Sequence, residues 1–206
     1  MGTDAGDGTG LLFRAGPAAV VIGGLDSRLL YVGLVGLVGV QRLVELVIAR
    51  RHVRIAMARG GIEAGASHYP AMVAMHAAFL LAAPAEVWIL DRPLVPPLAL
   101  AMLAVLALAA GLRIWVIRTL SWRWTTRVIT VPGLAPVRDG PFRYLRHPNY
   151  LAVVAEIAAL PLVHGAWLTA LVFSILNALV LRVRLRVENE ALADATGQAR
   201  AEGESP

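Results

Sequence analysis

The chain contains no cysteine, and charged residues make up only 16% of its 206 positions. Without cysteine, disulfides and thiolate metal sites are excluded, and the redox compartment cannot be inferred. The five histidines show neither HxxxH nor HExxH spacing, so we expect no metal site. The sequence also lacks the GxGxxG fingerprint and the alternation of strands and helices that mark a soluble Rossmann-type domain.

The chain instead contains long runs of apolar residues. Hydrophobic residues make up 58% of it and the mean hydropathy is +0.67, whereas an ordinary soluble domain is about 45–50% apolar. Several runs reach the roughly 20 residues needed to cross about 30 Å of hydrocarbon. We therefore predict an all-α integral membrane protein surrounded by membrane lipids.

We predict five membrane segments: Leu29–Ala49, Tyr69–Leu90, Leu94–Ile117, Tyr150–Val163 and Ala166–Leu185. The fourth is short because Pro161 ends it, and the tight Leu162–Gly165 link makes it a helical hairpin with the fifth. The long stretch Arg118–Asn149 contains six glycines and prolines, so it cannot be one helix. No internal repeat relates the two halves, which argues against an inverted-repeat transporter.

Lysine is absent, and all 19 basic residues are arginine. Fifteen of them fall within residues 50–59, 113–146 and 182–200, which five crossings place on one side; three fall on the other side, and Arg42 lies within a span. Cytoplasmic loops of membrane proteins collect Lys and Arg. The long loop and the C-terminus are therefore predicted to be cytoplasmic, and the basic excess indicates orientation rather than nucleic-acid binding.

The first informative motif is Gly140–Tyr150, with the sequence GPFRYLRHPNY. Pro148 suits the first turn of a helix, where its missing N–H costs nothing. Free backbone N–H groups at that helix start, together with His147 and Asn149, would form a site for a carboxylate. The alternative interpretation is an interfacial anchor of arginine and aromatic side chains, and the motif alone does not decide between the two.

The second motif lies where the last helix leaves the membrane, in Arg182–Leu192 (RVRLRVENEAL). Helical spacing puts Arg184 above Glu188 and Arg186 above Glu190. These are either two solvated ion pairs, each worth a few tenths of a kcal/mol, or glutamates that hold ribose hydroxyls or an amine beside an arginine that orients a substrate oxygen.

Together the two motifs resemble the isoprenylcysteine carboxyl methyltransferase family, over about Arg113–Gly197. The resemblance implies that S-adenosylmethionine binds in a cytoplasmic pocket between the loop and the end of the last helix. Carried over by position, Leu134–Val137 line this pocket and Arg184 is the catalytic residue that faces the acceptor oxygen. The cofactor contacts implied in the same way are Val137, Phe142, His147, Pro148, Asn149, Tyr150 and Glu188.

Three features depart from the family pattern: two residues and the C-terminal tail. Asn189 stands where the second glutamate of a pair is usual, and Ala152 stands where a glycine often follows. The tail after Gly197 is short and lacks the aromatic segment of the prenylcysteine enzymes. The departures weaken prenylcysteine as the substrate more than they weaken methyl transfer.

The N-terminal half resembles the bacterial branch of the family encoded beside type III polyketide synthases, through Gln41–Glu45 and Arg59–Pro70. That resemblance implies O-methylation of a lipophilic small molecule, a long-chain alkylpyrone or alkylresorcinol. The alternatives are carboxyl methylation of isoprenylcysteine-like substrates, phospholipid N-methylation, sterol reduction, or a transporter or scaffold without methyltransferase activity.

The chain then divides into three parts. Residues 1–28 form a flexible Gly-rich leader, and residues 29–117 form three helices on the substrate side. Residues 118–206 carry the cofactor loop, the helical hairpin and the C-terminal helix end. Methyl transfer requires the methyl carbon and the acceptor oxygen to approach within about 3–3.5 Å. We expect Arg184 to position that oxygen, with the lipid tail entering between helices.

Ionisable side chains inside a span are costly and mark either function or a paired structural contact. Arg42 and Glu45 are three residues apart and either neutralise each other or serve the site. We expect Glu86, near the end of its span, to be solvated. Glu156 lies deeper, where a functional polar role and a helix–helix hydrogen bond explain it equally well.

Overall fold

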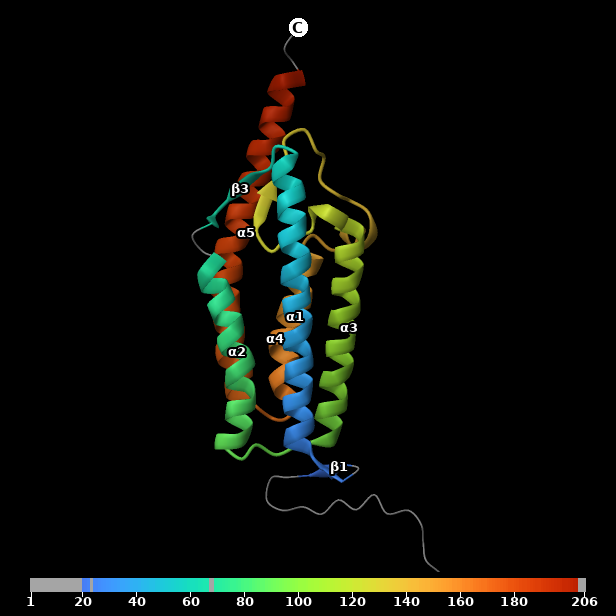
Figure 1. The fold of residues 1–206 in the computed structure, drawn as a ribbon, viewed down its shortest axis with the longest axis vertical. Coiled ribbons are helices and arrows are strands. Elements are labelled where there is room, and N and C mark those ends of the chain that lie inside the picture. Colours follow the sequence, from blue (N-terminus) through green and yellow to red (C-terminus); the bar gives the residue numbers. More distant parts are fainter. Residues whose placement is uncertain (1–19, 23, 67–68, 204–206) are drawn as a thin grey trace, which may run out of the picture.

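The computed structural model describes residues 20–22, 24–66 and 69–203. In Figure 1 the helices form a bundle, with a loop-rich cap at the end where α5 continues toward the C-terminus. The helices are α1 (Ser27–Ala58), α2 (Tyr69–Ile89), α3 (Pro96–Leu120), α4 (Pro148–Leu162) and α5 (Trp167–Gly203). The strands are β1 (Val21–Ile22), β2 (Leu25–Asp26), β3 (Ile62–Ala64) and β4 (Val128–Thr130), and two 3-10 turns are η2 (Ser121–Arg123) and η3 (Gly140–Arg143).

Within the described part of the chain, four helical stretches are long and apolar enough to cross a membrane. They are Ser27–Ala58, Tyr69–Ile89, Pro96–Arg123 and Trp167–Ala193. The fifth apolar helix, α4, has 15 residues, which is about 22 Å at 1.5 Å per residue and less than the hydrocarbon thickness. The helical membrane architecture is confirmed, while five full crossings remain a prediction.

Two helix ends differ from the sequence-based prediction. Helix α1 begins at Ser27, because the Asp26 carboxylate accepts the Arg28 backbone N–H at 2.8 Å and caps the helix. Strands β1 and β2 precede it. The leader predicted over residues 1–28 stays a prediction, since residues 1–19 lie outside the described residues. Helix α5 continues from its apolar part far past Leu185, which carries its polar end beyond the span.

The predicted hairpin of α4 and α5 is confirmed. Pro148 occupies the first turn of α4, as the sequence indicated, and α4 ends at Leu162, next to Pro161. In the link, Gly165 has a φ of +69°, and a Cβ there would lie 2.8 Å from the Pro93 carbonyl oxygen. Only glycine fits this close approach without strain.

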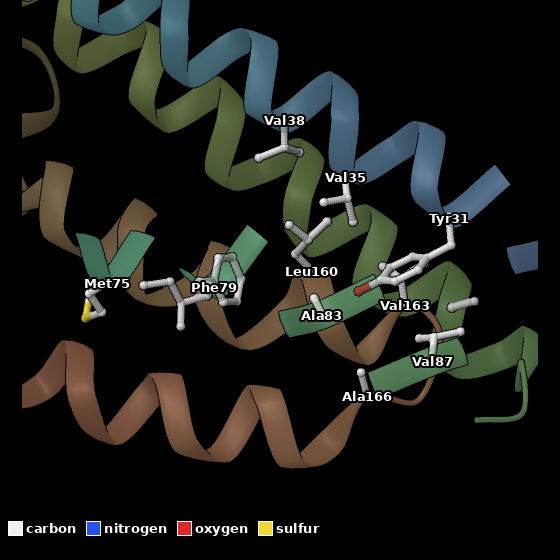
Figure 2. Packing of buried hydrophobic residues seen from close by; sticks show 12 residues of the cluster. Tyr31, Val35, Val38, Met75, Phe79, Ala83, Val87, Leu160, Val163 and Ala166 are labelled. Carbon is white, nitrogen blue, oxygen red and sulfur yellow. The ribbon is translucent and has the colours of Figure 1, made fainter. Parts of the chain in front are cut away.

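A cluster of buried apolar side chains joins α1, α2 and the hairpin (Figure 2). Phe79 is 2% exposed, and its ring meets Phe173 of α5 at a centroid distance of 5.5 Å. At the link end, the fully buried His164 lies 3.1 Å from the Ser27 hydroxyl, and burial lowers the pKa of its imidazole below the ordinary value. It therefore stays neutral at neutral pH, as an apolar environment requires.

The structure corrects the expectation that Glu86 is solvated. Its side chain is buried and accepts the backbone N–H groups of Leu168 and Thr169 at 3.2 and 2.6 Å. Arg92 Nε donates to the same carboxylate at 2.9 Å. Glu86 thus satisfies the free N–H groups at the start of α5, where a negative charge is stabilised by the helix dipole.

At membrane depth, two arginines and two glutamates form a closed ion-pair network across three helices. Arg42 of α1 reaches Glu45 at 2.5 Å and Glu156 of α4 at 2.6 Å. Arg113 of α3 reaches the same two carboxylates at 3.4 and 3.2 Å. Arg42 and Glu45 do neutralise each other, but as half of a larger set with zero net charge. Because the four groups are largely buried, each depends on the others for its pairing.

Replacing Glu156 by alanine should therefore destabilise the fold by about 3 kcal/mol, since two buried guanidinium groups would share one carboxylate. At about 2–4 °C per kcal/mol, thermal unfolding in detergent should shift down by roughly 6–12 °C. The control is Glu190→Ala on the exposed part of α5, which should cost under about 0.5 kcal/mol. An equal, small shift for both variants would contradict the structural role of the network.

Candidate active site

A small sheet holds the long loop against the other end of the bundle. Strands β3 and β4 pair antiparallel, with Ile62 opposite Thr130, and so connect the link after α1 to the loop after α3. The Arg127 guanidinium reinforces this pairing through the Glu63 carboxylate at 3.0 Å. At the far end of the loop, Gly140 has a φ of +57°, and a Cβ there would clash with the Thr119 side chain. The loop therefore packs directly on the end of α3.

A pocket lies between β4, η3, the start of α4 and the exit of α5, at the capped end of the bundle. Its empty space is about 680 Å³ with its open mouth included. Seven of the eight residues singled out from the sequence line it: Phe142, His147, Pro148, Asn149, Tyr150, Arg184 and Glu188. We call it the cap pocket.

Val137 is placed differently. It lines a neighbouring hollow with Ala135 and Pro136, and that hollow shares Leu120 and Arg123 with the cap pocket. Arg123 Nη1 donates to the Ala135 carbonyl at 2.8 Å and so fixes this part of the loop against η2. The segment lies beside the cap pocket rather than in its wall.

The Tyr150 hydroxyl connects the two sequence motifs. It donates to the Glu188 carboxylate and accepts a hydrogen bond from Arg184 Nε at 2.9 Å. The Arg184 guanidinium also lies 5.6 Å from the Tyr150 ring centroid, and the His147 ring stacks on that ring at 5.5 Å. Arg184 and Glu188 therefore meet through Tyr150, and the interpretation as a simple solvated ion pair does not hold for them.

Arg184 is held from three sides. Besides Tyr150, its Nη1 donates to the Thr126 carbonyl at 2.7 Å and lies 3.3 Å from the Met72 sulfur of α2. The residue is only 7% exposed. Among the described residues its Nη2 has no partner, so two N–H donors stay available in a fixed position.

A second, larger space opens inside the bundle, which we call the membrane cavity. It measures about 1490 Å³ with its open sides included, and most of its lining is Leu, Val and other apolar side chains from α1, α2, α4 and α5. Its polar lining comes from Arg42, Glu45, His76, Arg113 and Asn177 at depth. Five residues line both spaces: Trp124, Thr125, Asn149, Tyr150 and Arg184. The cap pocket and the membrane cavity thus meet at these residues.

The groups in the cap pocket suit a ligand that carries both signs of charge and a flat ring. Arginine side chains from the long loop line it: Arg123, Arg127 and Arg146. Glu188 supplies a negative charge, and Phe142 and Trp124 supply aromatic rings. The Asn149 Oδ1 atom is buried with no hydrogen-bond partner in the described part of the chain. A buried, unpaired acceptor is costly unless a ligand donor meets it. These are the features that an amino-acid nucleoside such as S-adenosylmethionine requires.

Sequence reasoning missed Trp124 of the loop, which lines both spaces, and the α2 residues that line the membrane cavity. Trp124 is 3% exposed, and His52 Nδ1 donates to its carbonyl at 2.8 Å, so α1 holds it in place. On α2, cavity-lining residues recur at helical spacing: Tyr69, Met72, Val73, His76, Ala77 and Leu80. That stripe was readable in the sequence, but in an apolar helix it cannot be told from ordinary core packing.

Replacing Tyr150 by phenylalanine removes the hydroxyl that holds both Arg184 and Glu188 but keeps the ring that stacks on His147. We expect the dissociation constant for S-adenosylmethionine, measured by calorimetry, to rise about tenfold, the value of one hydrogen bond of this kind. The matched control is Tyr144→Phe, since Tyr144 is 74% exposed. Equal affinity of both variants would show that the Tyr150 hydroxyl does not organise the pocket.

Comparison with known proteins relates the segment that carries both motifs to one family. Residues 100–194, which contain both motifs, match the model of the isoprenylcysteine carboxyl methyltransferase (ICMT) family. The chain is 37% identical to the uncharacterized protein YpbQ of Bacillus subtilis over 163 residues, covering 78% of this chain and 95% of YpbQ. It is 31% identical to an uncharacterized protein of Haemophilus influenzae over 153 residues, covering 74% of this chain and 88% of that protein. No solved structure gives a significant match.

Proposed function

This chain belongs to the isoprenylcysteine carboxyl methyltransferase family and is therefore a membrane methyltransferase, and we propose that it methylates an oxygen of a lipophilic acceptor with S-adenosylmethionine. The observation that carries the proposal is the junction of the cap pocket and the membrane cavity at Asn149, Tyr150 and Arg184. A water-soluble cofactor and an apolar acceptor require two different environments that meet at one point.

In this proposal the cap pocket holds the cofactor. Its arginines bind the carboxylate, Glu188 accepts from a hydroxyl or amine, and Asn149 Oδ1 accepts from a further donor. When bound, the cofactor would supply a methyl group on a sulfonium; the acceptor oxygen would bond to the methyl carbon, and the neutral thioether would leave in line. Phe142 and Trp124 cover the site and exclude water. The positive-inside arginine pattern supports a cytoplasmic position for this pocket.

The membrane cavity holds the acceptor, whose tail enters between helices from the lipid. Arg184 positions the reacting oxygen through its free Nη2 donors, because a planar guanidinium fixed at Nε and Nη1 cannot turn away. The apolar lining fits a long alkyl chain, and we propose a polyketide-derived alkylpyrone or alkylresorcinol. An isoprenylcysteine-like carboxylate is the second candidate, because the same Nη2 donors also suit a carboxylate.

The test measures transfer of labelled methyl from S-adenosylmethionine by the full chain in lipid nanodiscs. The acceptors are an alkylresorcinol, an alkylpyrone, a prenylcysteine analogue and phosphatidylethanolamine. Arg184→Ala should lower kcat about 100-fold or more, as removal of one transition-state donor does elsewhere. Glu188→Gln should instead weaken cofactor binding about tenfold or more, because it removes a charged acceptor.

Matched controls lie on α5, two residues after each of the tested positions. Arg186 and Glu190 are exposed, so Arg186→Ala and Glu190→Gln should leave transfer and cofactor affinity unchanged. Labelling of a different acceptor class would replace our substrate assignment but keep the methyltransferase. Failure of the folded wild type to bind S-adenosylmethionine would contradict the proposed cofactor and the site with it.

A further inference from the structure

One polar side chain in the membrane cavity has no role in the arrangement so far. His76 lies on the α2 stripe that faces the cavity, with Met72 one turn toward the cap and Leu80 one turn deeper. The side chain is half-buried, and a histidine inside a membrane span is costly to keep there without a function.

The hydrogen bond of His76 fixes its tautomer. Nδ1 lies 2.8 Å from the Met72 carbonyl oxygen, and a carbonyl can only accept, so Nδ1 carries the proton. In the neutral ring Nε2 then has a free lone pair. Nε2 has no hydrogen-bond partner among the described residues, and it is not among their enclosed, unpaired atoms. Nε2 is therefore accessible, on a side chain that lines the cavity.

His76 is also close to the junction with the cap pocket. Met72, whose carbonyl holds the ring, contacts Arg184 Nη1 through its sulfur at 3.3 Å. Met72 therefore contacts both side chains, the imidazole through its carbonyl oxygen and the guanidinium through its sulfur.

The charged groups around His76 leave no carboxylate dedicated to it. Glu156, Arg42 and Arg113 act on it electrostatically, and all three are paired within the ion network. The titratable groups that line the same cavity are Arg42, Glu45, Tyr69, Arg113, Tyr150 and Arg184. Because each network carboxylate already faces two guanidinium groups, the imidazole is the neutral proton acceptor that this lining offers.

We propose that His76 is the general base for methyl transfer and that the acceptor is a hydroxyl lipid, a phenol or an enol, rather than a carboxylate. This inference rests on the proposed function. A carboxylate is already ionised and needs no base, whereas a neutral hydroxyl must lose its proton as it reacts.

In the proposed step, the acceptor oxygen forms a bond to the methyl carbon while the carbon–sulfur bond breaks and its electron pair goes to sulfur. The hydroxyl proton passes to His76 Nε2, which becomes an imidazolium and later returns the proton to water. Arg184 meanwhile holds the oxygen, or a neighbouring one on the same ring, at the junction.

The test variant is His76→Asn, whose amide can still donate to the Met72 carbonyl but has no basic nitrogen. With an alkylresorcinol as acceptor, kcat/KM at neutral pH should fall about 100-fold or more, and the acidic limb of the wild-type pH profile should disappear. His76→Gln should behave alike and serves as the second variant should His76→Asn fail to fold.

The matched control is His52→Asn. His52 also donates Nδ1 to a backbone carbonyl, but it lines neither the cap pocket nor the membrane cavity, so the acidic limb should remain. A readout without cofactor is the visible absorbance of bound 4-dodecyl-2-nitrophenol. At one pH the wild type should hold a larger phenolate fraction than His76→Asn.

Two results separate the inference from the proposed function. The role of His76 would be overturned, and the proposed function kept, if His76→Asn methylated alkylresorcinol at the wild-type rate with an unchanged pH profile and phenolate fraction. Methylation of a prenylcysteine carboxylate but of no hydroxyl lipid would overturn the substrate class. The proposed function itself would be contradicted if the wild type bound S-adenosylmethionine but methylated none of the acceptors.

Discussion

The site depends on the hydroxyl of Tyr150, which holds an arginine and a glutamate that are one turn apart on α5. Without it, Arg184 and Glu188 would form a helix-surface pair of little energetic value. With it, the guanidinium is fixed between the cap pocket and the membrane cavity, and the carboxylate is directed into the cap pocket. The short loop between α4 and α5 makes this possible, since the hairpin brings the start of α4 beside the exit of α5.

The membrane imposes the second constraint. An apolar cavity for a lipid acceptor removes packing from the middle of the bundle, and helices in lipid have no hydrophobic driving force to close the gap. The ion network of Arg42, Glu45, Arg113 and Glu156 connects α1, α3 and α4 beside that cavity. Its neutrality lets four charges stay at depth, and its two carboxylates are occupied by the two guanidinium groups. The same network therefore connects three helices and contributes polar groups to the lining of the cavity.

Much of this arrangement was predictable from the sequence. The hydropathy pattern gave the helices, and Pro148 marked the start of α4, because such local signals do not depend on partners. Seven of the eight site residues singled out from the sequence line the cap pocket, and all seven belong to the two motifs. Long-range contacts were not predictable: Glu86 is buried because α5 begins beside it, and Glu156 is paired because α1 and α3 pass nearby. The positions of Val137 and Trp124 were not predictable either. Both lie in a loop without periodicity, and sequence patterns do not determine the path of such a loop.

The central claim is that cofactor and acceptor are held in two spaces that meet at Tyr150 and Arg184. The most direct measurement is a crystal structure of the full chain in lipid with S-adenosylhomocysteine and a long-chain alkylresorcinol bound together. We expect the nucleoside between β4 and the exit of α5, the alkyl chain between α1 and α2, and the phenolic oxygen beside Arg184. A nucleoside bound elsewhere, or an alkyl chain confined to the outer surface of the bundle, would contradict the account.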